Sequence, residues 1–222
     1  MLPDYAIGPS DEELLSDSFR GRLRCLNEIV LATGAPLEGN LFYFQGARDL
    51  GTAPDPARIH KRRNLWRALA GRHRLLEIGF NAGHSALLAL SAAPQLTYLG
   101  VDIAGNPYTS LCADLMKRWF GDRFLFVTGD SREMLPALWL QGGQCFDLIH
   151  VDGGHGAGTC LADIANGLRL ADPAGSLLLL DDTAHPPIRA IHDRFLAAGL
   201  LERDDRDGSW EGSESLLARI LC

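Results

Sequence analysis

Apolar residues change their spacing near residue 74 of the chain. Before that point, five of them recur at the spacing of one helix face: Leu15, Phe19, Leu23, Leu26 and Val30. Ser10 and Glu13 have the pattern of a capping box, so we expect this helix to begin at Ser10. Gly34 is expected to end it.

From Arg74 onward, short apolar runs alternate with segments of helical spacing. The predicted strands are Leu75–Gly79, Thr97–Asp102, Phe124–Thr128, Phe146–Asp152 and Ser176–Asp181. The predicted helices are Ser85–Ala92, Tyr108–Phe120, Arg132–Leu140, Thr159–Leu170 and Pro187–Ala198. A terminal hairpin follows, with strands at 200–206 and 216–221 and a turn at Asp207–Gly208. This order predicts an α/β fold with a mostly parallel seven-stranded sheet and right-handed crossovers.

The segment 35–57 precedes the alternating part of the chain. It is rich in glycine and proline and encloses the run Leu41–Phe44, which favours either a lid over a substrate pocket or an extension packed on the core. Ile59–Leu69 is a predicted helix whose basic run His60–Arg63 is expected on a solvated face, although one of these cations could meet a carboxylate. We therefore divide the chain into an N-terminal helical or lid extension, 1–70, and a ligand-binding α/β domain, 71–222.

Composition and charge narrow the range of partners. The 222 residues, of which 46% are hydrophobic, are enough to bury a full core. A formal net charge of −7 argues against DNA or RNA, because phosphate binding relies on clustered Lys and Arg. We expect a small-molecule substrate and no nucleic-acid partner.

The sequence also bears on compartment and assembly. Five cysteines lie far apart without a Cys-x-x-Cys pair, so neither a zinc site nor a disulfide framework is indicated. The first residues lack a basic region followed by an apolar run, and no stretch approaches the ~20 apolar residues of a membrane span. We expect a cytoplasmic protein without membrane contact, and the sequence leaves open whether it acts alone or as a homodimer.

The stretch 75–85 carries the first ligand motif. It has the pattern of a buried strand, a glycine turn and a helix, with the spacing Glu-x-Gly-x-x-x-Gly-x-Ser from Glu77 to Ser85. Gly79 and Gly83 would let the backbone approach a ligand closely. A phosphate-cradling loop would need Gly-x-Gly-x-x-Gly or Gly-Lys-Ser, and Glu77 would repel a pyrophosphate, so a cationic or zwitterionic ligand is favoured. An ordinary strand-to-helix turn is the alternative.

Two later strand ends add candidate cofactor contacts. Asp102, followed by Ile103, closes a predicted strand 23 residues after Gly79, where a carboxylate can accept hydrogen bonds from a ribose diol. The same position serves NAD, so it does not identify the cofactor. The run Gly129–Ser131 follows the third strand, where its acid or its hydroxyl could instead cap the next helix.

Three carboxylates follow the fourth and fifth predicted strands. Asp152 ends one strand, with His155 three residues on in a glycine-rich loop, and the pair Asp181–Asp182 ends the next. If the strands are neighbours, these acids converge at one edge of the sheet, and a divalent cation would relieve their repulsion. Oxygen ligands without cysteine suit Mg²⁺ or a similar ion. Helix capping by the acids is the alternative.

Together these motifs resemble class I S-adenosylmethionine (SAM)-dependent methyltransferases, which have a Rossmann-like fold. The stretch 77–85, Asp152 and the pair Asp181–Asp182 are similar in order and spacing to metal-dependent O-methyltransferases of the catechol and caffeoyl-CoA type. The element Asp152–His155 is more similar still to macrolide-sugar O-methyltransferases of natural-product biosynthesis. The match covers about residues 70–185, and Gly156–Ala157 stands where many relatives carry an aromatic residue.

The resemblance implies two cofactors and their ligands. Residues 71–222 would form a SAM-binding methyltransferase domain, with Glu77 near the amino end of SAM and the run 129–131 at its adenine. The implied SAM contacts are Glu77, Gly79, Asn81, Gly83, Ser85, Asp102, Ile103, Gly129, Asp130, Ser131 and Asp152. The implied Mg²⁺ ligands are Asp152, Asp181 and Asp182.

The implied reaction is O-methylation of a hydroxyl on a sugar, a phenol or a natural-product intermediate. The cation, with Asp152 as a ligand, would lower the pKa of the hydroxyl, and His155 would take its proton as general base. His155 could also be a loop histidine without a task, His150 is expected to be a core histidine, and His185 is a second candidate base. Other readings are a metal-independent SAM methyltransferase, a non-catalytic SAM-binding module and an NAD-dependent oxidoreductase, which would need Gly-x-Gly-x-x-Gly.

Overall fold

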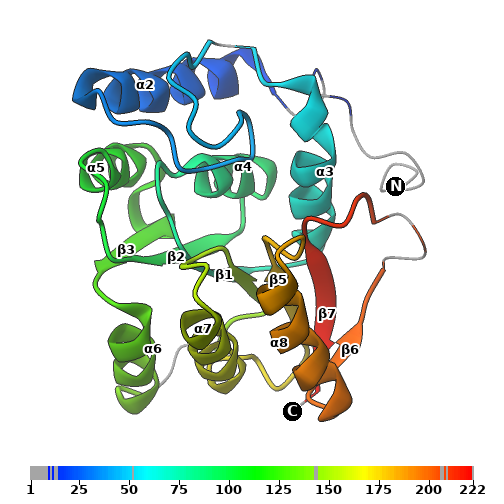
Figure 1. The fold of residues 1–222 in the computed structure, drawn as a ribbon. Helices are drawn as coiled ribbons and strands as arrows, with labels where there is room; N and C mark the ends of the chain where they lie inside the picture. Colours follow the sequence, from blue (N-terminus) through cyan, green and yellow to red (C-terminus); the bar gives the residue numbers. More distant parts are fainter. Residues whose placement is uncertain are drawn as a thin grey trace.

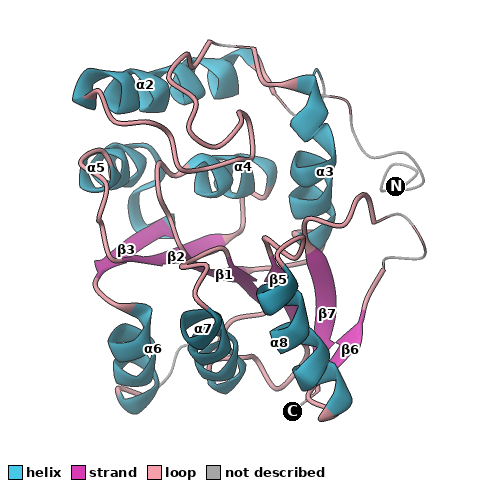
Figure 2. Ribbon diagram, viewed as in Figure 1, coloured by secondary structure: helices cyan, strands magenta, loops and turns pink. Residues whose placement is uncertain are grey.

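The computed structural model describes residues 10, 12, 15–51, 53–142, 145–205, 208 and 210–221, in which a seven-stranded sheet lies between two layers of helices (Figures 1 and 2). The strands are β1 Arg74–Ile78, β2 Thr97–Asp102, β3 Phe124–Thr128, β4 Leu148–Val151, β5 Ser176–Leu180, β6 Leu201–Arg203 and β7 Leu216–Ile220. The helices are α2 Asp17–Thr33, α3 Ile59–Ala68, α4 His84–Ala92, α5 Thr109–Phe120, α6 Ser131–Leu140, α7 Ala157–Arg169 and α8 Pro186–Ala197, with short 3₁₀ turns at Pro56–Arg58 and Gly121–Arg123.

The order of the strands across the sheet is β3-β2-β1-β4-β5-β7-β6. The first five are parallel, whereas β7 pairs antiparallel with both β5 and β6. This confirms the predicted α/β class, the mostly parallel sheet and the antiparallel ending. Part of the predicted turn, at Asp207, lies outside the described residues. The strand order reverses between β1 and β4, and ligands of such sheets bind beyond the carboxyl ends of the strands at that point.

Alternate residues of each strand enter two apolar cores, one on each face of the sheet. Helices α3 to α5 cover one face, with α2 packed outside α4 and α5, and helices α6 to α8 cover the other face (Figure 1). Leu75 of β1 belongs to the buried cluster that includes Leu87 of α4, whereas the next strand residue, Leu76, belongs to the cluster on the opposite face. Within the described residues, no helix is long and apolar enough to cross a membrane.

The predicted N-terminal helix is interrupted. Glu12 is helical whereas Leu15 and Ser16 are not, so one unbroken helix from Ser10 to Gly34 is wrong. The predicted capping box is not tested, because Glu13 lies outside the described residues. Helix α2 starts at Asp17, and the hydroxyl of Ser16 caps it by accepting a hydrogen bond from the backbone N–H of Phe19 at 3.2 Å. Gly34 ends α2 at φ 70°, as predicted.

The segment before α3 is packed against the core by its aromatic residues. Phe42 is fully buried and contacts the ring of Phe19 at a centroid distance of 5.7 Å. Lys61 and Arg62 of the basic run are buried and His60 and Arg63 are half-buried, so the predicted solvated face is wrong, while the alternative that one of these cations meets a carboxylate is confirmed by Lys61. Arg62 is completely buried and donates hydrogen bonds to the carbonyl oxygens of Leu41 at 3.0 Å and Asp55 at 3.1 Å. Its guanidinium therefore satisfies backbone groups of an irregular segment.

Candidate functional site

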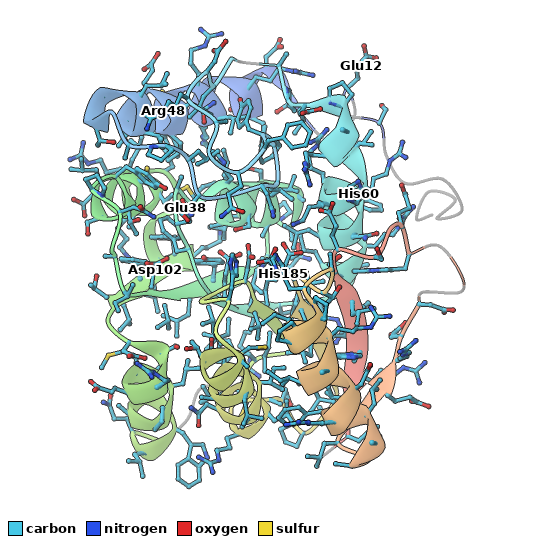
Figure 3. All side chains as sticks on the ribbon, in the orientation of Figure 1. Glu12, Glu38, Arg48, His60, Asp102 and His185 are labelled. Carbon is cyan, nitrogen blue, oxygen red and sulfur yellow. The ribbon has the colours of Figure 1, made fainter. Side chains whose placement is uncertain are left out.

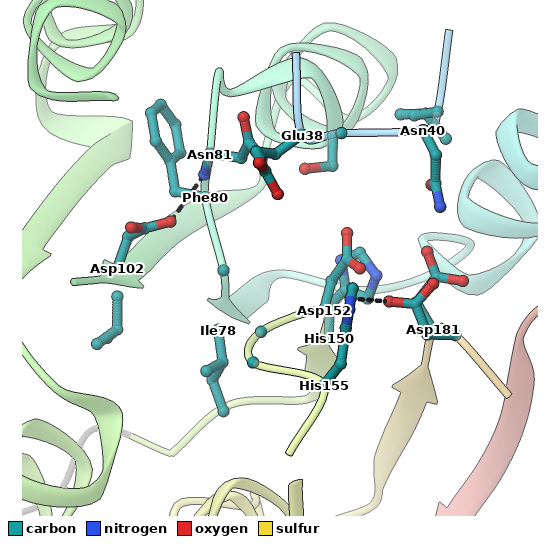
Figure 4. Close-up of a pocket in the computed structure, with 18 of the residues that line it drawn as sticks. Glu38, Asn40, Ile78, Phe80, Asn81, Asp102, His150, Asp152, His155 and Asp181 are labelled. Atoms are coloured by element: carbon teal, nitrogen blue, oxygen red, sulfur yellow. Dashed lines mark hydrogen bonds and ion pairs between the residues drawn. The ribbon is translucent and has the colours of Figure 1, made fainter. Parts of the chain in front are cut away.

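A cavity of about 480 Å³ lies at the carboxyl ends of the parallel strands (Figures 3 and 4). One side of it holds the glycine loop and Asp102, and the other side gathers Asp152, Asp181 and two histidines (Figure 4). The N-terminal segment and α3 supply the facing wall: Glu38, Gly39, Asn40, Leu41, Gln45, Lys61, Asn64 and Leu65. The segment 35–57 is thus both packed on the core and part of a ligand cavity.

The glycine loop is shaped by contacts that exclude side chains. Gly79 has φ +94°, and a Cβ added there would lie 2.1 Å from the carbonyl oxygen of Asp152. Gly83 has φ +76°, and its Cβ would lie 2.5 Å from the ring of Phe80. Asn81 adopts φ 54°, which is uncommon for a residue other than glycine. Gly79 therefore allows a close backbone junction with the end of β4, and Gly83 allows the loop to close on the ring of Phe80.

Asp102 closes the opposite side of this loop. Its carboxylate accepts hydrogen bonds from the backbone N–H of Asn81 at 2.8 Å and of Ala104 at 2.7 Å (Figure 4). Ile103 beside it is 68% exposed and lines the cavity. Gly79, Asn81, Ser85, Asp102 and Ile103 all line the cavity, whereas the predicted contact Gly83 is not among the described residues that line it.

The run at the end of β3 both caps a helix and lines the cavity. Asp130 is the N-cap of α6, and hydrogen bonds from Arg132 lower the pKa of its carboxyl to about 2. Ser131 donates a hydrogen bond to buried Asp163 at 2.6 Å. The capping alternative thus holds for Asp130, while the predicted adenine contact of Gly129 to Ser131 stays a prediction.

Glu77, expected to contact the amino end of SAM, lies buried behind the cavity wall. It is completely buried, accepts a hydrogen bond from the hydroxyl of Tyr98, and lies 2.7 Å from Nδ1 of His150. It is not among the described residues that line the cavity, whereas His150 is. Burial alone would lower the pKa of His150, but the hydrogen bond and charge of Glu77 raise it to about 9. Glu77 therefore orients a cavity histidine, and its predicted contact with the cofactor stays a prediction.

The predicted acids converge, but with separate partners. Ligand atoms of Asp152, Asp181 and His150 lie within 4.8 Å of one another, a grouping that could hold a metal ion. Burial, and next the charge of Asp181, raise the pKa of Asp152. Asp182, at φ 57°, turns aside, and its Oδ2 lies 2.6 Å from Nε2 of His155. The two predicted catalytic residues, Asp152 and His155, thus line one cavity, with Asp182 holding the histidine.

A lysine from α3 enters the acid cluster. Nζ of Lys61 lies 2.6 Å from Oδ2 of Asp181 and donates to Oδ1 of Asn40 at 2.5 Å. Burial alone would lower the pKa of Lys61, but Asp181 and Asp152 raise it above its ordinary value, so the side chain is an ammonium.

The C-terminal segment fastens α3 over the acid pair. Asn64 of α3 donates to the carbonyl oxygen of Glu211 at 2.7 Å, and its Oδ1 accepts from the Glu211 N–H at 3.0 Å. The N–H of Thr183, directly after the acids, donates to the carbonyl oxygen of Glu214 at 2.9 Å. Residues from both ends of the chain therefore meet beside Asp181 and Asp182.

Comparison with known proteins places this cavity in a family. Residues 76–183, which span β1 to the acid pair, match a family model described as a methyltransferase domain. The chain contains a methyltransferase domain. A methyltransferase of Aspergillus campestris, named ungE', is 30% identical over 74 residues, which are 32% of this chain and 22% of that protein. The chain spans at most 49% of the length of the curated relatives it matches.

Solved structures agree with this domain. An O-methyltransferase from Bacillus cereus in complex with SAH superposes with a TM-score of 0.64 at 16% identity, covering 96% of this chain and 94% of that one. TomG of Streptomyces achromogenes, an O-methyltransferase in complex with SAM, gives a TM-score of 0.62 at 16% identity over 97% and 92% of the two chains. These structures confirm the predicted Rossmann-like fold, and the match over residues 76–183 confirms the predicted methyltransferase domain.

Two residues of the methyltransferase cavity, Lys61 and Asn40, were absent from the sequence-based site. Lys61 could have been found, because it stands four and seven residues before Leu65 and Ala68 and so shares their buried helix face. Asn40 lies in an irregular segment without periodicity, and no sequence signal identifies it.

Proposed function

We propose that the chain is a SAM-dependent O-methyltransferase acting on a hydroxyl of a small molecule, such as a sugar, a phenol or a natural-product intermediate. One observation carries the proposal: a single cavity joins the glycine loop of a methyltransferase domain to an acid and histidine cluster. The net charge of −7 supports a small-molecule partner over nucleic acid.

The cofactor would occupy the side of the cavity formed by β1 to β3. Gly79 lines the cavity without a side chain, so SAM could lie against its backbone, while Gly83 lets the loop close on the ring of Phe80. Asp102 would accept hydrogen bonds from the ribose hydroxyls. Gly129, Asp130 and Ser131 would face the adenine, and Asp152 would lie at the amino acid end.

His155 would act as the general base. Its ring is held by Asp182 at 2.6 Å through Nε2, and its side chain is 47% exposed, so Nδ1 can face a bound hydroxyl. His155 would take the proton of the substrate hydroxyl, and SAM, when bound, would supply the methyl group that the oxygen receives. Holding donor and acceptor in one cavity supplies much of the acceleration.

A divalent cation such as Mg²⁺ belongs to the proposal. Asp152 and Asp181 would hold it, whereas Asp182, the third ligand implied by the sequence, would join them only by releasing His155. The hard oxygen donors of these carboxylates suit the cation, and the buried Oδ1 of Asp181 has no hydrogen-bond partner among the described residues. When bound, the ion would lower the pKa of the substrate hydroxyl. A second candidate is metal-independent transfer, which the ammonium of Lys61 beside Asp181 favours.

The test is a binding and transfer assay on the purified chain. We expect S-adenosylhomocysteine to bind saturably and NADH not to bind. Methyl-labelled SAM should then label an oxygen in one class of a panel of sugars, phenols and other hydroxyl compounds, and repeating the assay with Mg²⁺ or EDTA separates the two candidates. Saturable NADH binding without S-adenosylhomocysteine binding would refute the cofactor, and cofactor binding without transfer to any acceptor would favour a non-catalytic module.

A further inference from the structure

The acid cluster already contains a cation supplied by the chain. The Lys61 ammonium lies 2.6 Å from Asp181 and 3.9 Å from Oε2 of Glu214, and the Asn40 side-chain oxygen accepts one of its hydrogen bonds at 2.5 Å. The lysine side chain is only 4% exposed. A lysine this deeply buried beside a carboxylate is a fixed charge rather than a solvated one.

The backbone of α3 holds Lys61 in this position. Leu65 and Ala68, on the same helix face, are buried in the core, and Arg62 is tied to the carbonyl oxygens of Leu41 and Asp55. The side chain of Lys61, however, lines the open cavity. The helix is therefore anchored while the ammonium has space into which it can move.

Asp181 is the carboxylate for which Lys61 and a divalent ion would compete. It is 6% exposed, Lys61 engages its Oδ2, and its Oδ1 is buried without a hydrogen-bond partner among the residues described. A divalent ion bound to this carboxylate would lie ~2 to 2.5 Å from its oxygen, and so within a few ångströms of the ammonium. Two cations at such a separation in a buried site repel strongly.

We propose that Lys61 is the resident cation of this cluster and sets its affinity for divalent ions. The ammonium and a divalent ion hold Asp181 alternately, so an ion binds only when Lys61 swings into the cavity. That movement also breaks the hydrogen bond to Asn40, which couples ion binding to the wall formed by the N-terminal segment. The inference rests on the acid cluster of the proposed function and not on the identity of the methyl acceptor.

The first experiment measures Mn²⁺ binding to the full chain by calorimetry. Removing the competing charge in Lys61→Met should tighten Mn²⁺ binding on the order of tenfold or more. The sequence has only one other lysine, Lys117, which is 49% exposed, so Lys117→Met is a matched control expected to leave the affinity unchanged. Adding Asp181→Asn to Lys61→Met should remove the gain. Equal affinity in Lys61→Met and the unaltered chain, including no binding to either, would overturn the proposal.

The second experiment needs no variant at Lys61 and so avoids the risk of misfolding. In protein labelled at the lysine side chains, NMR should give two signals, and Mg²⁺ should shift that of Lys61 while leaving Lys117 in place. A Lys61 signal that stays still while the cluster saturates with the ion would overturn the proposal. Neither experiment uses SAM or an acceptor, so failed methyl transfer with intact competition would count only against the proposed function.

Discussion

The two sides of the cavity are built in different ways. The cofactor side is formed mainly by backbone, with positive φ angles at Gly79, Asn81 and Gly83 and the Asp102 carboxylate tied to loop N–H groups. The acid side is formed by side-chain charges, with Lys61 on Asp181 and His155 on Asp182.

The comparison teaches which parts of the site depend on distant sequence. Backbone shape at the ends of β1 and β2 follows from local residue choice, since glycine and short caps decide it. The charges on the acid side are balanced only when α3, in a different part of the chain, is in place. The cofactor side should therefore respond to local substitutions, and the acid side to changes in pairing.

The largest effect is expected from Gly79→Ala, because Gly79 lies where the loop of the cofactor side contacts the backbone of Asp152 on the acid side. A Cβ 2.1 Å from the Asp152 carbonyl oxygen forces the backbone apart, so we expect loss of S-adenosylhomocysteine binding and a free energy of unfolding lower by roughly 3 kcal/mol or more. Calorimetry measures the binding of S-adenosylhomocysteine, and urea unfolding measures the free energy of unfolding. Gly71→Ala is the control, since Gly71 has φ +72° with no atom within 4 Å of its added Cβ. Equal losses in both variants would mean that backbone strain, not the contact with Asp152, matters.

His155→Ala tests the acid side alone. We expect the rate of methyl transfer to the acceptor found in the screen to fall ~10²- to 10⁴-fold, because the general base is lost. The dissociation constant of S-adenosylhomocysteine should not change. His185→Ala is the matched control, since its ring stacks on that of His155 at a centroid distance of 5.6 Å. A larger loss of rate in His185→Ala would move the role of base to His185.

His84 offers a pH test at the start of α4. Burial lowers the pKa of His84 to about 4, whereas a histidine in the unfolded chain titrates near 6.5. Between these values only the unfolded chain takes up the proton, so the free energy of unfolding should fall by up to about 3 kcal/mol as the pH drops from 6.5 to 4. His84→Gln, which can still donate to Asn27, should lose this part of the pH dependence in urea unfolding. His73 is exposed, so His73→Gln should keep the full pH dependence of the free energy of unfolding. The same pH dependence in both variants would contradict its assignment to His84.

Asp102→Asn should have the smallest effect. The amide keeps one acceptor oxygen but loses the charge, so we expect the dissociation constant of S-adenosylhomocysteine to rise about tenfold. Mn²⁺ binding on the acid side should be unaffected. Asp172→Asn is the control, because Asp172 also accepts a backbone N–H two residues on, from Ala174 at 2.9 Å, at a distance from the cavity. A change in Mn²⁺ binding in Asp102→Asn would show that the two sides are coupled.

The sequence predicts the fold and the cofactor side well because their signals are local. Strands Thr97–Asp102 and Phe124–Thr128 match the structure at both ends, and the glycine spacing marks the turn after β1. The break between Glu12 and α2 was not predicted, because the apolar spacing from Leu15 to Val30 reads as one continuous helix face. The pairing of Lys61 with Asp181 and of Glu77 with His150 depends on contacts between distant elements, which composition and spacing do not encode.

The contact of α3 with the C-terminal segment has a consequence for how the protein is made. Asn64 and Glu211 are 147 residues apart, so their paired hydrogen bonds form only after synthesis has passed Glu211. Domains generally begin to fold from the N-terminus during synthesis, and contacts of such long range form late. We expect the nascent chain to build its cofactor side first and to complete the acid side only with the last strand.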